Sequence, residues 1–396
     1  MMLGDEWKNW SGSLSFRPAE TVTPESEEEV GFIVENAARV EKNVRVVGAG
    51  HSSSSLVETK DLLLSLHHFK GVESPDLNRN QATVLGGSTV HEAGSLLHDY
   101  GLAMHNTGDV DVQTVAGAIG TGTHGTGREL QNLSAMLIGV RMITGTGELV
   151  VIDDKELLQA LRVSLGSCGI FLNMRLQLQP TYRLFRKEWF VTIDRCLEDL
   201  EKLQQDNRNF DFYWYPRSDA AKIRIMNQSS DLMPEIKYGK LHRENNGSSH
   251  AILPRERSLK FDEIEYAFPA ESGPACFMEV RGLIKAKFRK EVAWRVLYRT
   301  VKADDAFLSP AYGRDTVTIS LHHNAGLPYE EYFNAVESIF RKYNGRPHWG
   351  KKHSLTAKEL QELYPEWNKF QRIRENFDPE GVFLSPYMKD LLINEQ

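Results

Sequence analysis

The sequence contains little cysteine, no long apolar run and no excess of positive charge. Its 396 residues include three cysteines, Cys168, Cys196 and Cys276, and none of them forms a CxxC pair. Such a sparse, odd set is typical of reduced thiols rather than of a disulfide framework. No apolar run is long enough to span a bilayer, and residues 1–10 lack the basic-then-apolar pattern of a secretion signal. We therefore expect a soluble, cytoplasmic protein without a membrane partner.

The formal net charge is −7 at pH 7, which weighs against general nucleic-acid binding. A protein of that class needs a basic face that releases phosphate counterions, so no nucleic-acid partner is predicted. No metal site is predicted, because the pairs His67-His68 and His322-His323 lack partner spacing of the HExxH kind. The Gly-x-Ser-x-Gly motif is absent, which leaves a serine hydrolase without support.

The length of the chain favours two domains, since one hydrophobic core rarely serves 396 residues. The first part alternates helix and strand signals. Ser26 and Glu29 have capping-box spacing before an apolar helical face, and Val44–Val47 predicts a strand. Strands are also predicted over 61–66 and 82–86, a helix over 90–100 that ends at Gly101, and a hairpin over 136–152. Near residue 180 the glycine-rich loops give way to aromatic and charged residues, so we expect a domain boundary there.

The predicted strand Val44–Val47 runs into Gly48-Ala49-Gly50-His51. Glycine has no Cβ, so backbone N–H groups at such a turn can approach a phosphate closely. The segment fails as a Rossmann fingerprint, because the third glycine falls at Ser53 and no good helix follows. A plain strand-to-loop turn is the alternative.

A second candidate loop runs from Thr114 to Gly127, with glycines and threonines at near-alternating positions. Backbone nests of this kind bind anions. The alternative is a flexible linker, which we disfavour because apolar residues such as Val115 and Ile119 favour burial.

Together these two segments resemble the FAD-binding domain of the vanillyl-alcohol oxidase superfamily, and most closely its aldonolactone oxidase and alditol oxidase branch. The blocks Leu165–Ile170 and Gly345–Lys351 carry the same resemblance. It implies an α+β fold with a two-part PCMH-type FAD-binding domain at residues 14–180. A substrate or cap domain, a β-sheet flanked by helices, is expected at 181–340. A C-terminal segment, 341–396, is expected to return to the flavin site.

The cofactor that the resemblance implies is FAD. In the family, the histidine of the first loop is bonded to the 8α-methyl carbon of the flavin, and His51 stands at this place. Covalent attachment is therefore expected, the alternatives being a surface-loop histidine or a flavin held without a covalent bond. The expected FAD-binding residues are Val47, Gly48, Ala49, Gly50, His51, Ser52, Ser53, Gly108, Asp109, Thr114, Gly117, Thr121, Gly122, Thr123, His124, Gly169, Ile170, His348 and Lys351.

The substrate pocket of the family often carries Glu-x-Arg before an Asp-Asp-x-x-Leu-Ser-Pro stretch. Here Asp304–Pro310 anchors the alignment, which places Arg299 at the arginine and Leu297 at the glutamate. Loss of this carboxylate removes a strong acceptor for substrate hydroxyls. The nearby Glu279-Val280-Arg281 has the same spacing, but it lies too far upstream and in a predicted helix, so we treat it as a decoy.

Four residues are expected to take part in catalysis: Asp109, Arg299, His322 and Lys351. His322 matches a histidine that lies near the reacting hydroxyl in alditol oxidases and would act as a base. Lys351 is expected near the flavin N1–C2 side, where its charge stabilises reduced flavin. Asp109 stands where relatives often carry a substrate-contacting serine and would partly replace the missing glutamate. An exposed strand histidine and a surface lysine are the alternatives for His322 and Lys351.

The expected reaction is oxidation of a hydroxyl group on a small, polar, sugar-derived substrate (an alditol, sugar or aldonolactone) by hydride transfer to flavin N5. Molecular oxygen is expected to reoxidise the flavin and give hydrogen peroxide, because Gly108 stands where a bulkier residue blocks oxygen in some relatives. No obligate protein partner is expected. The alternatives are a dehydrogenase with another electron acceptor and a flavin-binding protein whose pocket has decayed.

Overall fold

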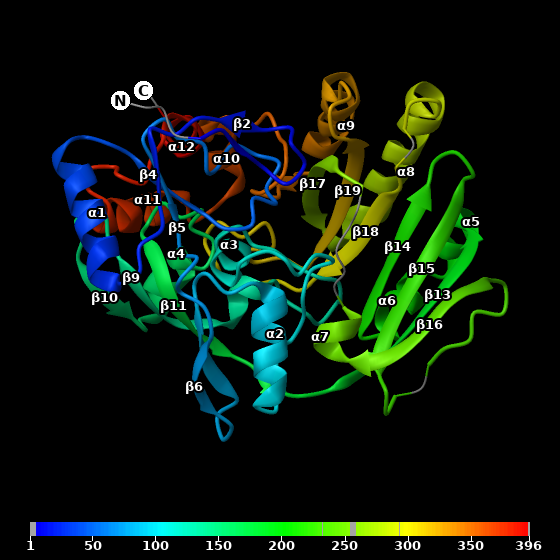
Figure 1. The fold of residues 1–396 in the computed structure, drawn as a ribbon. Helices are drawn as coiled ribbons and strands as arrows, with labels where there is room; N and C mark the ends of the chain where they lie inside the picture. Colours follow the sequence, from blue (N-terminus) through cyan, green and yellow to red (C-terminus); the bar gives the residue numbers. More distant parts are fainter. Residues whose placement is uncertain (1–4, 232, 254–258, 293, 395–396) are drawn as a thin grey trace.

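The computed structural model describes residues 5–231, 233–253, 259–292 and 294–394. Residues 1–4, part of the N-terminal segment considered above for a secretion signal, lie outside this range. Two parts stand side by side in Figure 1: a mixed part, residues 7–180, in blue to green, and a part built on one large sheet, residues 183–342, in green to orange. The C-terminal segment, in red, returns to the first part.

The smaller sheet of the first part has three parallel strands. Their order is β3 (Glu20–Val22), β5 (Leu62–Ser65) and β4 (Val44–Val47), and α1 (Glu27–Arg39) joins β3 to β4. Ser26 caps α1 by accepting a hydrogen bond from the backbone N–H of Glu29. The Glu29 carboxylate accepts from the N–H of Glu25, so the expected capping box is only half formed.

The larger sheet of the first part has five antiparallel strands. In order they are β10 (Leu149–Ile152), β9 (Leu137–Ile143), β11 (Ile170–Gln177), β7 (Gln81–Leu85) and β6 (Val72–Asp76). Besides α1, the described helices of this stretch are α2 (Val90–Asp99), α3 (Val115–Gly120), η1 (Leu133–Met136) and α4 (Lys155–Leu161). The short pair β8 (Leu102–Ala103) and β12 (Gln179–Pro180) leads into the second part.

Eight antiparallel strands form the sheet of the second part. In order they are β16 (Lys240–Ser248), β13 (Arg183–Thr192), β15 (Ala220–Gln228), β14 (Asn209–Tyr215), β18 (Val296–Val301), β19 (Thr316–Asn324), β17 (Phe261–Pro269) and β20 (Arg346–Pro347). Its helices are α5 (Ile193–Glu198), α6 (Leu200–Gln205), α7 (Ser249–Ile252), η2 (Ala270–Ser272), α8 (Gly273–Leu283), η3 (Ile284–Phe288) and α9 (Glu330–Lys342).

The alternation of side chains along the central strands separates two faces of this sheet. On one face, Phe277 of α8 packs edge-on against Tyr298 of β18 and Phe212 of β14. On the other face, Leu297 and Arg299 line a cavity shared with the first part. Both faces are buried, so the polar side chains of the second face lie in a largely desolvated environment.

Short elements at the two ends of the chain complete the first part. The N-terminal pair is β1 (Trp7–Lys8) and β2 (Ser15–Phe16), and the C-terminal helices are α10 (Ala357–Leu363), α11 (Trp367–Phe377) and α12 (Pro386–Leu392). Asp378 accepts hydrogen bonds from the backbone N–H groups of Val382 and Phe383, which fixes the turn between α11 and α12. The N–H of Val44 donates to the carbonyl of Val382, so this turn extends the edge of β4.

The fold class predicted from the sequence is confirmed: a mixed FAD-domain-like part precedes an antiparallel sheet with flanking helices. The strands, the helix and the hairpin predicted for the first part are present. One detail differs: residues 115–120 form the helix α3 inside the segment predicted to be a loop. His322 lies within β19. In the described part of the chain, no helix has the length and apolar character needed to cross a membrane.

Candidate active site

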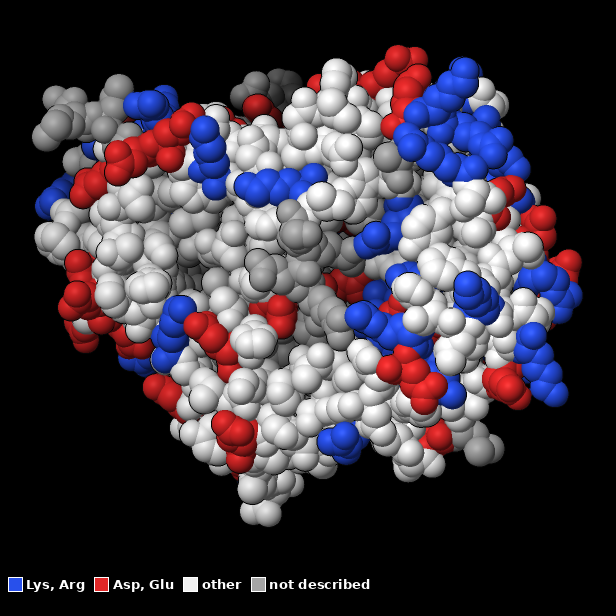
Figure 2. All heavy atoms as spheres, turned by 45° about the vertical axis from the view of Figure 1, so that its right-hand side comes forward, with Lys and Arg blue, Asp and Glu red and all other residues white. Residues whose placement is uncertain are grey.

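Two adjoining cavities are lined by residues of the two glycine-rich loops. The larger, about 340 Å³, lies within the first part, and the smaller, about 80 Å³, lies between the parts. His51 and Gln113 line both cavities. Figure 2 shows charged side chains of both signs around the hollowed centre of the face where the two parts meet.

The larger cavity contains most of the residues predicted to bind FAD. Those that line it are Val47, Gly48, Ala49, Gly50, His51, Ser52, Thr114, Gly117, Thr121, Gly169 and Ile170. Gly48 and Thr114 bring the two predicted loops into contact, because a Cβ at Gly48 would lie 2.3 Å from the Thr114 hydroxyl oxygen. Gly50 has φ of +66°, a conformation that side chains rarely adopt.

The lining of the larger cavity fits the pyrophosphate and nucleotide part of FAD. The described residues that line it include no aspartate or glutamate, and glycine backbone forms much of its wall. Backbone N–H groups of such loops are suitable donors for phosphate oxygens. Arg45 also lines this cavity, and its guanidinium donates to carbonyls of Leu56, Leu165, Gly166 and Phe383, which ties the cavity wall to the C-terminal segment.

His51 lies at the junction of the cavities, in contact with the N-terminal segment. The indole of Trp10 stacks on its imidazole, with ring centroids 4.9 Å apart and planes inclined by 22°. The backbone N–H of Trp10 donates to the carbonyl of Gly50, and the side-chain amide of Asn9 donates to the carbonyl of Ser52. Burial, together with the charge of Lys351, lowers the pKa of His51 to about 4, so the imidazole is neutral near pH 7.

The smaller cavity contains all four residues predicted to be catalytic. The predicted residues that line it are His51, Ser53, Gly108, Asp109, Thr123, His124, Arg299, His322, His348 and Lys351. The remaining predicted FAD-binding residue, Gly122, lies apart from both cavities, against Val163 and Pro310. Residues that are distant in the sequence thus converge on one desolvated space, which suits a small polar substrate beside a cofactor.

His322 and Lys351 meet at a carboxylate that the sequence reading did not single out. Glu263, on β17, forms an ion pair with the ammonium of Lys351, and its second oxygen lies 3.5 Å from Nε2 of His322. The Nδ1 atom of His322 lies 3.3 Å from the carbonyl oxygen of Arg295. Burial opposes ionisation of Glu263, but Lys351 and His322 outweigh it and hold its pKa below the ordinary value.

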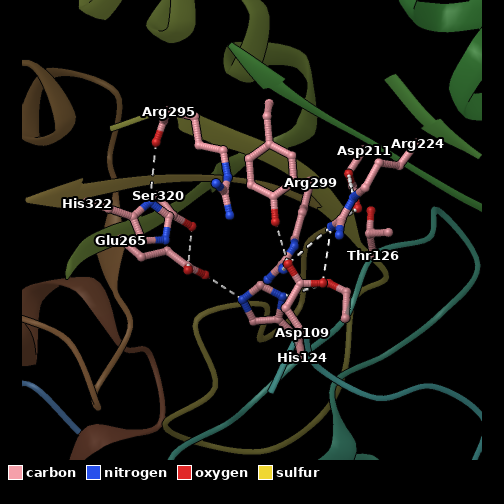
Figure 3. A network of polar contacts seen from close by, with 12 residues as sticks. Asp109, His124, Thr126, Asp211, Arg224, Glu265, Arg295, Arg299, Ser320 and His322 are labelled. Atoms are coloured by element: carbon pink, nitrogen blue, oxygen red, sulfur yellow. Dashed lines mark hydrogen bonds and ion pairs between the residues drawn. The ribbon is translucent and has the colours of Figure 1, made fainter. Parts of the chain in front are cut away.

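Asp109 is bonded to protein groups in the same cavity. Its carboxylate lies 2.8 Å from Nη2 of Arg299 and about 3 Å from Nη2 of Arg224, and it accepts a hydrogen bond from the Tyr213 hydroxyl at 2.6 Å. Figure 3 shows Arg224 reaching both Asp109 and Asp211. Burial works to lower the pKa of Arg299, and Asp109 and its neighbours raise it above the ordinary value, so this cation is permanent.

A second buried carboxylate on β17, Glu265, completes the polar wall. It lies 2.5 Å from Nε2 of His124 and accepts a hydrogen bond from the Ser320 hydroxyl at 2.5 Å (Figure 3). Burial opposes its ionisation, but His124 holds its pKa well below the ordinary value. His348 lines the same wall, and burial lowers its pKa to about 4.

Sequence reasoning missed the residues contributed by β17, by the N-terminal segment and by the loop before α3. They are Trp10, Ser11, Val110, Gln113, Phe261, Glu263 and Glu265. One local signal for these acids was available: Glu263 and Glu265 lie two residues apart, the spacing that places both carboxylates on one face of a strand. The Glu279-Val280-Arg281 segment lies in α8, where Glu279 pairs with Lys342 and lines neither cavity, as expected for a decoy.

Comparison with known families bears on this pair of cavities. A family model described as D-arabinono-1,4-lactone oxidase matches residues 174–237 and 230–391. The chain belongs to the D-arabinono-1,4-lactone oxidase family. A second model, described as FAD binding domain, matches residues 18–153, so the FAD implied by the family resemblance is confirmed as the cofactor. The resemblance to the aldonolactone oxidase branch is likewise confirmed.

Curated proteins similar to this chain include both oxidases and dehydrogenases. The chain is 33% identical to L-gulono-1,4-lactone dehydrogenase of Mycobacterium tuberculosis, over 98% of this chain and 99% of that protein. It is 27% identical to L-gulonolactone oxidase of Bos taurus, over 98% of each. A solved structure, cholesterol oxidase from B. sterolicum, shares the fold with a TM-score of 0.87 at 14% identity, covering 98% of this chain and 96% of that one.

The chain is therefore an FAD-dependent oxidoreductase of the D-arabinono-1,4-lactone oxidase family. Its described residues include no group of three or more histidine, cysteine, aspartate or glutamate side chains arranged to hold a metal ion.

Proposed function

We propose that this protein oxidises a hydroxyl group of a sugar-derived lactone, with bound FAD supplying the acceptor for the carbon-bound hydrogen and its two electrons. The observation that carries the proposal is the smaller cavity, in which His322, Lys351 and Arg299 lie beside the predicted flavin-linking residue His51. The names of the relatives, which include gulonolactone and arabinonolactone enzymes, favour an aldonolactone over an alditol or a free sugar.

In this proposal the protein side chains divide the work on the substrate. His322 accepts the hydroxyl proton at Nε2, since Nδ1 faces the carbonyl of Arg295 and carries the hydrogen in the neutral ring. Arg299 orients the lactone oxygens through its guanidinium, whose Nε has no hydrogen-bond partner among the described residues. Lys351 provides positive charge on the flavin side of the cavity.

We further propose that FAD is bonded covalently to His51. Two observations support it: the imidazole lines both cavities, and its low pKa leaves a ring nitrogen with an available lone pair at neutral pH. Ser52 and Ser53 follow directly, and the backbone of Ser53 donates to the carbonyl of Gly350, which closes the loop against the C-terminal segment.

Molecular oxygen is the proposed electron acceptor, with hydrogen peroxide as its product. Gly108 supports this proposal, because it lines the smaller cavity without a side chain. A dehydrogenase with a different acceptor is the second candidate, favoured by the name of the relative at 33% identity. We also propose the cytoplasm as the compartment, because all three cysteines are free and buried.

A screen of aldonolactones, alditols and sugars with two parallel readouts tests these proposals. Peroxide release measures the oxidase, and reduction of a soluble dye measures turnover with another acceptor. Flavin reduction by a lactone with peroxide release supports the first candidate, and dye reduction without peroxide supports the second. Failure of all these substrates to bleach the flavin absorbance would contradict both.

A further inference from the structure

Strand register shows where negative charge lies in the substrate cavity. Leu297 on β18 pairs with Ser320 on β19, which pairs with Glu265 on β17. Two residues further along the same two strands, His322 on β19 pairs with Glu263 on β17. The two glutamates on this face of the sheet thus belong to β17. This strand lies two strands away from β18, where Leu297 stands at the position of the family glutamate.

The backbone of the C-terminal segment brings Lys351 beside Glu263. The N–H of His348 donates to the carbonyl of Glu265, and the N–H of Lys352 donates to the carbonyl of Glu263, each at 2.9 Å. These bonds continue the edge of β17 beyond β20. Lys351, between the two bonded positions, therefore directs its ammonium to the Glu263 carboxylate.

The imidazole of His322 is held in one orientation toward the same carboxylate. Phe261 contacts it edge-on with centroids 4.7 Å apart, and Trp294 stacks on it at 5.8 Å and 25°. When Nδ1 carries the hydrogen, Nε2 presents a lone pair, and this nitrogen lies 3.5 Å from a Glu263 oxygen. The contact becomes attractive only when Nε2 is protonated. The titratable and charged side chains that line the cavity with His322 are His51, Asp109, His124, Glu263, Glu265, Arg299, His348 and Lys351. Arg295, whose carbonyl lies next to His322, directly precedes β18.

We propose that Glu263 is a positioning residue that couples His322 and Lys351, supplying from β17 the negative charge that Leu297 leaves out on β18. The proposal rests on the lactone oxidation proposed above. When the substrate O–H bond breaks, its proton goes to Nε2 of His322; bound FAD would supply the acceptor for the carbon-bound hydrogen and its two electrons. The new imidazolium then faces Glu263, which keeps the charge gained by the buried site compensated. Lys351 stays oriented by the same carboxylate.

Histidine titration in the holoenzyme tests the coupling without turnover. The NMR signal of His322 in histidine-labelled protein, assigned with His322→Gln, is followed against pH in wild type, Glu263→Gln and Glu263→Asp. Removal of the adjacent negative charge in Glu263→Gln is expected to move the His322 midpoint down by about 1 to 3 pH units. Glu263→Asp keeps the negative charge but places it further from His322, so it is expected to lower the His322 midpoint by a smaller amount.

The matched control is Glu188→Gln. Glu188 is a buried carboxylate of the same sheet that pairs with Arg186 at 2.5 Å and Lys222 at 3.1 Å, but it lines neither cavity. It is expected to lower stability and leave the His322 midpoint in place. In lactone-dependent flavin reduction, the acidic limb of kcat/KM is expected to follow the His322 midpoint of each variant.

The two proposals fail in different ways. An unchanged His322 midpoint in Glu263→Gln would overturn the coupling, even if lactone oxidation is observed. Absence of flavin reduction by every lactone would overturn the proposed function, while the midpoint shift would still establish the contact between Glu263 and His322. If Glu263→Gln does not fold, a midpoint in Glu263→Asp equal to that of wild type overturns the coupling.

Discussion

The carboxylate of Asp109 lies 2.8 Å from the guanidinium of Arg299, so the arginine in the substrate cavity is already paired within the protein. Asp109 also bonds Arg224 and Tyr213, which makes it the shared partner of two buried cations. The sequence reading assigned Asp109 to the substrate in place of a glutamate. The geometry favours a different use of this side chain, as a support for Arg299.

Replacement of Asp109 is therefore expected to reduce stability first. Asp109→Asn leaves Arg224 and Arg299 without full compensation, and the loss of a buried pair costs about 3 kcal/mol or more. Chemical unfolding measures this change, and lactone KM is measured beside it. The control is Asp305→Asn, because Asp305 is 44% exposed and pairs with Arg162, so about 0–1 kcal/mol is expected. A raised KM with an unchanged unfolding midpoint would instead assign Asp109 to the substrate.

Removal of the His51 side chain is expected to abolish the covalent bond to the flavin without abolishing FAD binding. In His51→Ala the glycine loops that line the larger cavity remain, so FAD is retained at neutral pH but lost on acid precipitation. Absorbance of pellet and supernatant measures the two fractions, and in wild type the colour stays with the pellet. His67→Ala is the control, because His67 lines the same cavity but is exposed. Colour in the wild-type supernatant would refute the covalent bond.

A methyl group at Gly108 is expected to slow reoxidation by oxygen. The added Cβ would lie 3.2 Å from Cγ2 of Thr123 and would narrow the smaller cavity. Gly108→Ala should therefore retain lactone-driven flavin reduction and dye-dependent turnover while air reoxidation slows by about tenfold or more, a barrier change of about 1.4 kcal/mol. Stopped-flow absorbance measures both half-reactions. Gly282→Ala serves as the control, since a Cβ there meets no atom of the described residues within 4 Å beyond its own stretch of helix. Equal reoxidation rates in Gly108→Ala and wild type would show that oxygen reaches the flavin by another path.

Acid is expected to destabilise the fold partly through His353. Neither of its buried ring nitrogens has a hydrogen-bond partner among the described residues, and burial lowers its pKa to about 4. The unfolded chain, with an ordinary histidine pKa of about 6.5, binds one more proton between these two pH values. As the pH is lowered from about 6.5 to about 4, His353 alone therefore decreases the free energy of unfolding by about 1.4 kcal/mol for each pH unit.

The variant His353→Phe removes this titrating imidazole. The slope of the free energy of unfolding against pH, between about pH 6.5 and 4, should therefore decrease by about 1.4 kcal/mol per pH unit. Urea unfolding at several pH values measures the slope. The control is His68→Phe, which alters an exposed histidine. A slope equal to that of wild type would mean that His353 gains a partner or a solvent path on protonation.

The sequence by itself determined the cofactor loops and their elements. The Gly48–His51 turn, the capped helix after Ser26 and the hairpin at 136–152 depend on local backbone preferences, so short-range patterns suffice to identify them. The same holds for the decoy at Glu279, since its helical surroundings were visible in the sequence.

Only the tertiary structure decided which charges meet in the substrate cavity. Glu263, His322 and Lys351 converge because β17 pairs with β19 on one side and with the C-terminal segment on the other. Asp109, in a loop of the first part, reaches Arg299 on β18 across more than 180 residues of chain because the two parts pack together at the smaller cavity. Strand order and register arise from long-range packing of a sheet that is buried on both faces, so no local pattern in the sequence specifies them.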